Sequence, residues 1–155
     1  MTPYNPLQTN LPPMDTKQVI REIKALSLPN DQYVTVGGAA LAVRGYRHTD
    51  DIDLVVTQPL FERLKSEGWE QKSRPNGRLG LKRGSVEVYL EVNAPAYARD
   101  TEWLIAHSER VEGIPLADLN TLLGWKMAYG RDKDASDVEL LEKTIRDKTG
   151  AHPVT

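Results

Sequence analysis

The stretch that decides the fold is VTVGGAALAVRGYRHTDDIDLVV, residues 34–56. A β-branched run comes first, is broken by Gly37 and Gly38, and gives way to a short apolar segment of helical composition. A second β-branched run begins between two aspartates, Asp51 and Asp53. The pattern predicts a strand over 33–36, a helix over 39–43 and a strand over 52–56.

The two aspartates have the spacing that places side chains on the same side of a strand, roughly 6.5–7 Å apart. Two ionised carboxylates at that distance repel each other unless a cation lies between them. Mg²⁺ prefers oxygen ligands and usually takes one or two carboxylates, with water and substrate phosphates completing its shell. Asp51 and Asp53 therefore predict a Mg²⁺ site, with Mn²⁺ as an alternative. We expect two such ions here, because a pair about 4 Å apart can clamp the attacking and leaving oxygens of phosphoryl transfer.

The glycine pair allows a phosphate group to bind. Without Cβ atoms, Gly37 and Gly38 allow a sharp bend and a close approach of phosphate to main-chain N–H groups at the start of the next helix. No Gly-Lys-Ser/Thr follows, which excludes a Walker loop, and the Gly-x-Gly-x-x-Gly of dinucleotide-binding proteins is missing. A glycine pair alone is usually a turn, and Asp-x-Asp alone is usually a solvated strand start. Their combination at this spacing indicates a phosphate and metal site.

The glycine pair, the short helix and the segment RHTDDIDL, residues 47–54, resemble the nucleotidyltransferase superfamily related to DNA polymerase beta. The likeness is greatest to the small prokaryotic AbiEii-like and minimal nucleotidyltransferases. A second block, LNTLLGWKMAYGRDKDASDVELL over 119–141, is similar to a helical segment of those proteins. The resemblance implies Mg²⁺-dependent transfer of a nucleoside monophosphate from an NTP to a hydroxyl of tRNA, a protein or a small molecule. It also implies a toxin–antitoxin or phage-defence setting.

The same resemblance implies a third carboxylate on a neighbouring strand. Apolar residues alternate with polar ones over 86–92, which predicts that strand, and its polar face carries Glu87, Tyr89 and Glu91. The superfamily usually has Asp here. We choose Glu91 because Leu90-Glu91-Val92 matches the apolar-acid-apolar triplet, with Glu87 as the alternative. The expected catalytic and metal-binding residues are thus Asp51, Asp53 and Glu91.

Five further residues are expected to bind the NTP. They are Gly37, Gly38, Arg47, Thr49 and Lys126. For three of them a structural role stays open: Arg47 can solvate a helix end, Thr49 can orient the carboxylate loop, and Lys126 can extend its amine to water. We read the charged residues over 131–137 as a salt-bridged helix junction. Because the third acid is Glu, the alternative function is a catalytically decayed module that binds a protein partner or senses a nucleotide.

Composition limits the class of protein. The 155 residues suffice for one domain, and a net charge of −2 argues against a surface that grips nucleic acid throughout. The lack of cysteine excludes disulfides and thiolate metal sites. No signal peptide or membrane span is recognisable, so we expect a cytoplasmic protein without a membrane partner. The sequence carries no signal for an oligomeric state.

The expected fold is α+β: a mixed β-sheet flanked by helices, followed by a C-terminal helical hairpin. We expect a flexible proline-rich arm over 1–14 and one nucleotidyltransferase-like domain over 15–150. Within that domain, 15–114 form the sheet core and 115–150 the helical segment. Asp15 is the expected N-cap of the first helix, with Gln18 at the capping-box position.

Overall fold

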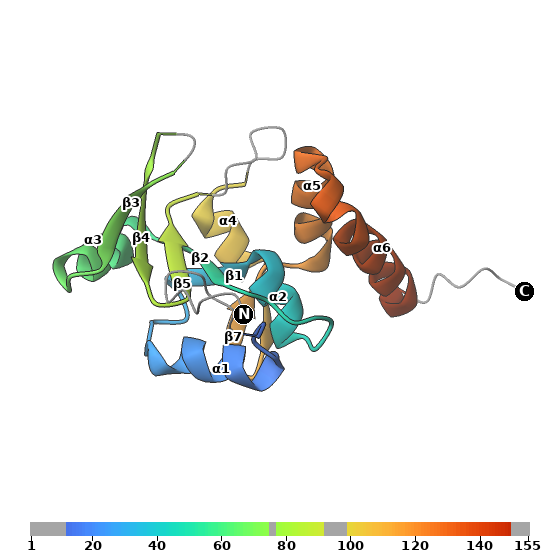
Figure 1. The fold of residues 1–155 in the computed structure, drawn as a ribbon, viewed down its shortest axis with the longest axis horizontal. Coiled ribbons are helices and arrows are strands. Elements are labelled where there is room, and N and C mark those ends of the chain that lie inside the picture. The colour runs from blue at the N-terminus through green and yellow to red at the C-terminus, as the bar shows by residue number, and fades with distance from the viewer. Residues whose placement is uncertain (1–11, 75–76, 92–98, 150–155) are drawn as a thin grey trace, which may run out of the picture.

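A computed structural model describes residues 12–74, 77–91 and 99–149 of the chain (Figure 1). Its seven strands are β1 (Tyr33–Val36), β2 (Ile52–Val56), β3 (Glu70–Ser73), β4 (Leu79–Arg83), β5 (Val86–Tyr89), β6 (Glu109–Val111) and β7 (Ile114–Leu116). The helices are α1 (Thr16–Ala25), α2 (Gly37–Val43), α3 (Gln58–Ser66), α4 (Thr101–Ala106), α5 (Leu119–Tyr129) and α6 (Ala135–Thr149), with a 3₁₀ turn η2 (Asp132–Asp134).

The strands form one mixed sheet in the order β3-β4-β5-β2-β1-β7-β6. At its centre β2 pairs antiparallel with β1 and parallel with β5, and the parallel register sets Asp53 opposite Glu87. All four residues of β1 are buried, as are four of the five in β2, because helices cover both faces. The α+β architecture predicted from the sequence is confirmed.

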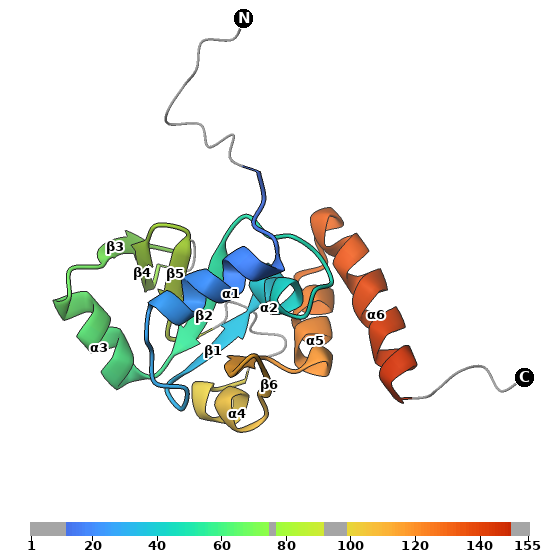
Figure 2. The same cartoon turned by 90° about the horizontal axis from the view of Figure 1, so that it is seen from below.

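Helices α1 and α2 lie on one side of the central strands, and α4 lies on the other (Figure 2). The predicted capping box at the start of α1 is present: Asp15 accepts from the Gln18 amide at 2.9 Å, and Gln18 accepts from the Asp15 amide at 3.3 Å. Helix α2 begins at Gly37 rather than at Ala39 as expected. The φ angle of Gly37 is +63°, a left-handed conformation that favours glycine.

Helices α5 and α6 form the expected helical hairpin on one side of the sheet (Figures 1 and 2). Gly130 ends α5 in the left-handed conformation, at φ +59°. Leu119 and Leu122 are buried as expected. Helical spacing over 117–129 also predicts that Met127 points inward, but its side chain is 60% exposed. Apolar residues occur all round α5, so helical spacing does not select one buried face.

Met14 was expected to belong to the N-terminal arm, but it is buried and pairs with Thr49 through two backbone hydrogen bonds. It therefore fixes the loop that leads to Asp51. Residues 1–11 of the expected arm lie outside the described residues. No helix in the described segments combines the length and the apolar composition needed to cross a membrane.

Candidate active site

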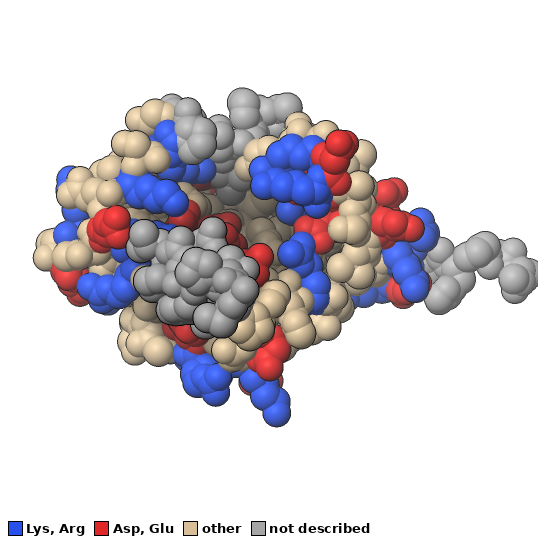
Figure 3. Space-filling view, viewed as in Figure 1, with Lys and Arg blue, Asp and Glu red and all other residues tan. Residues whose placement is uncertain are grey.

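A cavity of about 580 Å³ lies between the sheet and the helical hairpin. The space-filling view shows the molecule hollowed there, with acidic and basic side chains around the hollow (Figure 3). Its lining includes Gly37, Gly38, Arg47, Thr49, Asp51, Asp53, Lys72, Arg74, Glu87, Tyr89, Trp125, Lys126, Tyr129, Arg131 and Lys133. The volume falls in the range of small-molecule and cofactor sites.

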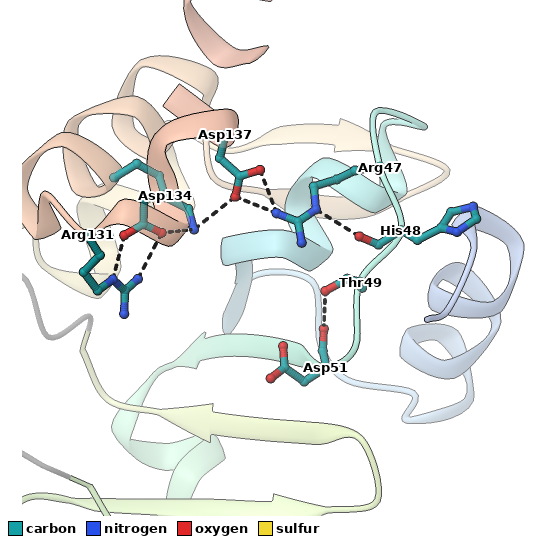
Figure 4. Close-up of polar contacts among 8 residues, drawn as sticks. Arg47, His48, Thr49, Asp51, Arg131, Asp134 and Asp137 are labelled. Carbon is teal, nitrogen blue, oxygen red and sulfur yellow. Dashed lines mark hydrogen bonds and ion pairs between the residues drawn. The ribbon is translucent and has the colours of Figure 1, made fainter. Parts of the chain in front are cut away.

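The loop before β2 positions the first carboxylate. Thr49 is 3% exposed, and its hydroxyl donates to the backbone oxygen of Asp51 at 3.0 Å (Figure 4). Backbone bonds to Met14 hold the same residue at 2.7 and 3.1 Å. Thr49 thus has the orienting role left open by its sequence position. Asp51 stands one residue before β2 and Asp53 lies within it, and both reach the cavity.

The two glycines make room for these groups. A Cβ on Gly38 would lie 2.7 Å from the Thr49 hydroxyl oxygen, a distance that real Cβ atoms do not adopt. On Gly37 a Cβ would lie 3.4 Å from a carboxylate oxygen of Asp53, and the positive φ already disfavours a side chain. The pair therefore brings the start of α2 directly against the carboxylate loop and strand.

Of the two candidates for the third acid, the structure places Glu87 at the cavity and Glu91 away from it. Strand β5 ends at Tyr89, so Glu91 lies beyond the sheet pairing that would align it with β2. There its carboxylate contacts Arg78, and its backbone oxygen accepts from Arg74 at 3.0 Å. Glu87 faces Asp53 across the β2–β5 pair. The first choice of Glu91 is corrected to Glu87 for the acid that faces the cavity.

The surroundings of Glu87 favour its charged form. Lys72 donates to Glu87 at 2.9 Å, and the Tyr89 hydroxyl donates to its other oxygen. Although burial alone raises the pKa of Glu87, these two hydrogen bonds and the charges of Lys72 and Lys82 hold it below the usual value. The negative charge of the Glu87 carboxylate is therefore already balanced by cations of the protein itself.

The two aspartates have the opposite environment. Burial, followed by the charges of Asp51 and Glu87, raises the pKa of Asp53 to about 7. Burial and the charges of Glu87 and Asp50 also raise the pKa of Asp51. Neither aspartate forms a salt bridge within the described residues. The Asp51–Asp53 pair thus concentrates negative charge, and a bound cation would relieve the repulsion between the carboxylates.

The raised pKa of Asp53 gives a testable dependence of stability on pH. Between pH 4 and 7, folded Asp53 keeps a proton that the unfolded chain has lost, so rising pH reduces stability through this group. The shift from 3.8 to about 7 corresponds to a loss of at most about 4 kcal/mol. We expect Asp53→Asn to remove that loss, so that in EDTA its melting temperature exceeds the wild-type value more at pH 8 than at pH 5. Asp31→Asn, in an exposed turn, is the control. The pKa shift would be contradicted if the melting temperatures of the wild type and of Asp53→Asn changed in parallel with pH.

The oxygen ligands at this site suit one divalent cation that also binds water or phosphate, rather than an ion surrounded entirely by protein ligands. Asp51 and Asp53 offer hard oxygen ligands, and a Mg²⁺ ion needs only one or two carboxylates. No group of three or more His, Cys, Asp or Glu side chains in the described residues is arranged to hold a metal ion. We therefore assign Asp51 and Asp53 as the residues that would bind the ion.

A charged network joins the helical hairpin to the carboxylate loop (Figure 4). Lys126 contacts Asp134 at 2.9 Å and Asp137 at 3.2 Å, and Arg47 contacts both oxygens of Asp137 at 2.6 Å. Arg131 contacts Asp134 at 2.6 Å. Asp134 and Asp137 are 2% and 3% exposed. The predicted salt-bridged junction is present, and it includes Arg47 and Lys126, which were expected to bind the NTP and also line the cavity.

Removing one buried charge should test this network. In Asp137→Asn, Arg47 and Lys126 lose a shared partner, which we expect to cost about 2 kcal/mol, discounted because Arg47 is 39% exposed. The melting temperature should fall by roughly 6 °C. Glu139→Gln, an exposed position on the same helix, is the matched control. Equal melting temperatures for the two variants would show that the network adds no stability.

Arg74 and Tyr89 are among the cavity residues that the sequence did not single out. The Arg74 guanidinium lies 4.0 Å from the centre of the Tyr89 ring, and the Tyr89 hydroxyl lies 3.4 Å from Asp53. A Cβ on Gly80 would come within 3.1 Å of that ring. The available signals were weak: Tyr89 shares the polar face of its strand with Glu87, and Arg74 belongs to a basic stretch over 62–83.

Comparison with known proteins supports the fold. No known family model matches the chain, and no curated protein does. Among solved structures, it is similar to the crystal structure of a "putative nucleotidyltransferase" from Thermotoga maritima, with a TM-score of 0.51 and 19% sequence identity. The match covers 86% of this chain and 96% of the other. The fold is nucleotidyltransferase-like.

Proposed function

We propose that this protein is a Mg²⁺-dependent nucleotidyltransferase that moves a nucleoside monophosphate from an NTP to an acceptor hydroxyl. The acceptor oxygen forms a bond to the α-phosphorus, the bond from that phosphorus to the α–β bridging oxygen breaks, and pyrophosphate leaves. The hydroxyl proton passes to solvent. The observation that carries the proposal is the pair of Asp51 and Asp53 carboxylates, which have no salt-bridge partner among the described residues, in a large cavity directly beside Gly37 and Gly38.

Positioning and charge neutralisation account for most of the catalysis in such reactions. Asp51 and Asp53 hold the ion, which when bound neutralises phosphate charge and orients the NTP. Gly37 and Gly38 leave space for the triphosphate. Basic side chains of the protein, Arg74 among them, line the same cavity and add positive charge beside the triphosphate. We favour a macromolecular acceptor, tRNA or a partner protein of a toxin–antitoxin or phage-defence pair, because the hollow is open to solvent (Figure 3).

The test is an incubation of the purified protein with each α-³²P-labelled NTP, Mg²⁺ and a total extract of RNA and protein. We expect one labelled species that disappears in EDTA. Its sensitivity to ribonuclease or protease identifies the acceptor class. No label from any of the four NTPs would contradict the proposal.

A second candidate function is NTP binding without transfer, as in a nucleotide sensor or a decayed partner module. The environment of Glu87 favours this second function, because Lys72 and Tyr89 already donate hydrogen bonds to its carboxylate. A thermal-shift titration separates the cases: at 100 times the dissociation constant, Mg²⁺–NTP should stabilise the protein by about 2.7 kcal/mol. Stabilisation without release of pyrophosphate supports the sensor, and no stabilisation contradicts both functions.

A further inference from the structure

Both carboxylate oxygens of Glu87 are engaged by donors from the protein itself. Oε1 accepts from the Lys72 amine at 2.9 Å, and the Lys82 amine lies 3.9 Å from the same oxygen. Oε2 accepts from the Tyr89 hydroxyl. The Glu87 side chain is only 17% exposed. A metal ion bound to this carboxylate would therefore lie close to the Lys72 ammonium.

The sheet register explains why the cations gather there. Lys82 on β4 lies opposite Glu87 on β5, which in turn lies opposite Asp53 on β2. Lys72 on β3 lies opposite Gly80, which adds no side chain between Lys72 and β5. These residues therefore share the face of the sheet that borders the cavity. Lys72 and Glu87 thus lie on strands of one sheet, with β4 between them, and the contact does not depend on a loop.

No lysine or arginine of the described segments forms a salt bridge with Asp51 or Asp53. The Tyr89 hydroxyl lies 3.4 Å from a carboxylate oxygen of Asp53. Three carboxylates thus divide into a pair that requires an added cation and a single acid that already has one. A two-ion site places its ions about 4 Å apart with carboxylates shared between them. An ammonium 2.9 Å from Glu87 repels a second dication at that position.

We propose that the chain binds one divalent cation, at Asp51 and Asp53, and that the Lys72 ammonium on Glu87 takes the place of a second ion. Lys72 lines the cavity and is 51% exposed, so its remaining N–H groups can donate to a phosphate oxygen of the ligand. This replaces the expectation of two Mg²⁺ ions. The inference rests on the proposed function for the identity of the ligand, an NTP.

The test is a count of bound ions, which needs no turnover. Mn²⁺ is titrated into the full chain with a saturating, non-hydrolysable α,β-methylene NTP analogue, and free Mn²⁺ is followed by electron paramagnetic resonance. We expect one bound Mn²⁺ per wild-type chain. In Lys72→Met, Oε1 loses its hydrogen-bonded ammonium and can serve as a ligand, so we expect the count to rise to two. The double variant Lys72→Met/Glu87→Gln returns it to one.

Lys65→Met, which removes an exposed lysine on α3, is the matched control and should bind one ion. Circular dichroism verifies that each variant is folded. Two ions in the wild type, or one in Lys72→Met, would overturn the inference while leaving the proposed function intact. No bound ion in the wild type would instead contradict the Mg²⁺ site of the proposed function, and the inference with it.

Discussion

Asp53→Asn should slow nucleotidyl transfer by at least about 10³-fold, the equivalent of about 4 kcal/mol of transition-state stabilisation. Asn keeps the size of the side chain but removes the charge that balances a divalent cation. The substitution also relieves repulsion from Asp51 and Glu87, so the folded state should persist. Loss of activity in a protein of unchanged or higher stability distinguishes metal binding from a structural role.

The measurement is the rate of pyrophosphate release at saturating NTP and Mg²⁺, with circular dichroism to verify the fold. Asp31→Asn removes an exposed carboxylate from a turn distant in sequence and should keep the full rate. Asp51→Asn should behave like Asp53→Asn. A rate for Asp53→Asn within threefold of the wild type would remove Asp53 from the proposed site.

Gly38→Ala should destabilise the protein by roughly 2–3 kcal/mol and reduce transfer more than tenfold. The added Cβ would lie 2.7 Å from the Thr49 hydroxyl oxygen. Thr49 cannot withdraw, because Met14 holds its backbone and the oxygen of Asp51 holds its hydroxyl. The strain must therefore displace either the start of α2 or the loop that carries Asp51. Thermal unfolding and the rate of transfer measure the two effects.

A double-mutant cycle tests the cause. Thr49→Ala removes the oxygen that clashes but also the hydrogen bond to Asp51, so alone it should be moderately destabilising. Combined with Gly38→Ala, it should recover at least about 1 kcal/mol relative to the sum of the single variants. Additive effects would show that the contact between Gly38 and Thr49 is not the source of the strain.

Local patterns were sufficient to predict most of the fold. The strands over 33–36 and 52–56 and the capping box at Asp15 depend on residues adjacent in sequence, and all are present. Helix α2 begins two residues earlier than predicted, because Gly37 itself adopts the left-handed turn that starts it. Lys126 was expected to bind the NTP or to extend its amine to water, and its amine contacts Asp134 and Asp137.

The choice between Glu87 and Glu91 shows where such patterns fail. Both residues lie on the same face of an alternating segment, so period-two spacing does not distinguish them. Only the pairing of β5 with β2 does, since it aligns Glu87 with Asp53 and ends at Tyr89. That register depends on packing between strands that are distant in sequence. The same applies to Lys72 on β3, whose contact with Glu87 on β5 spans the intervening strand β4.

The most direct test of the central proposal is to follow which phosphate of the NTP moves. The protein is incubated with acceptor extract, Mg²⁺ and the same NTP labelled either at the α- or at the γ-phosphorus. Nucleotidyl transfer at the Asp51–Asp53 site predicts that only the α-label enters the acceptor, while the γ-label appears in pyrophosphate. A γ-label in the acceptor, or no label in it from either substrate, would contradict the account.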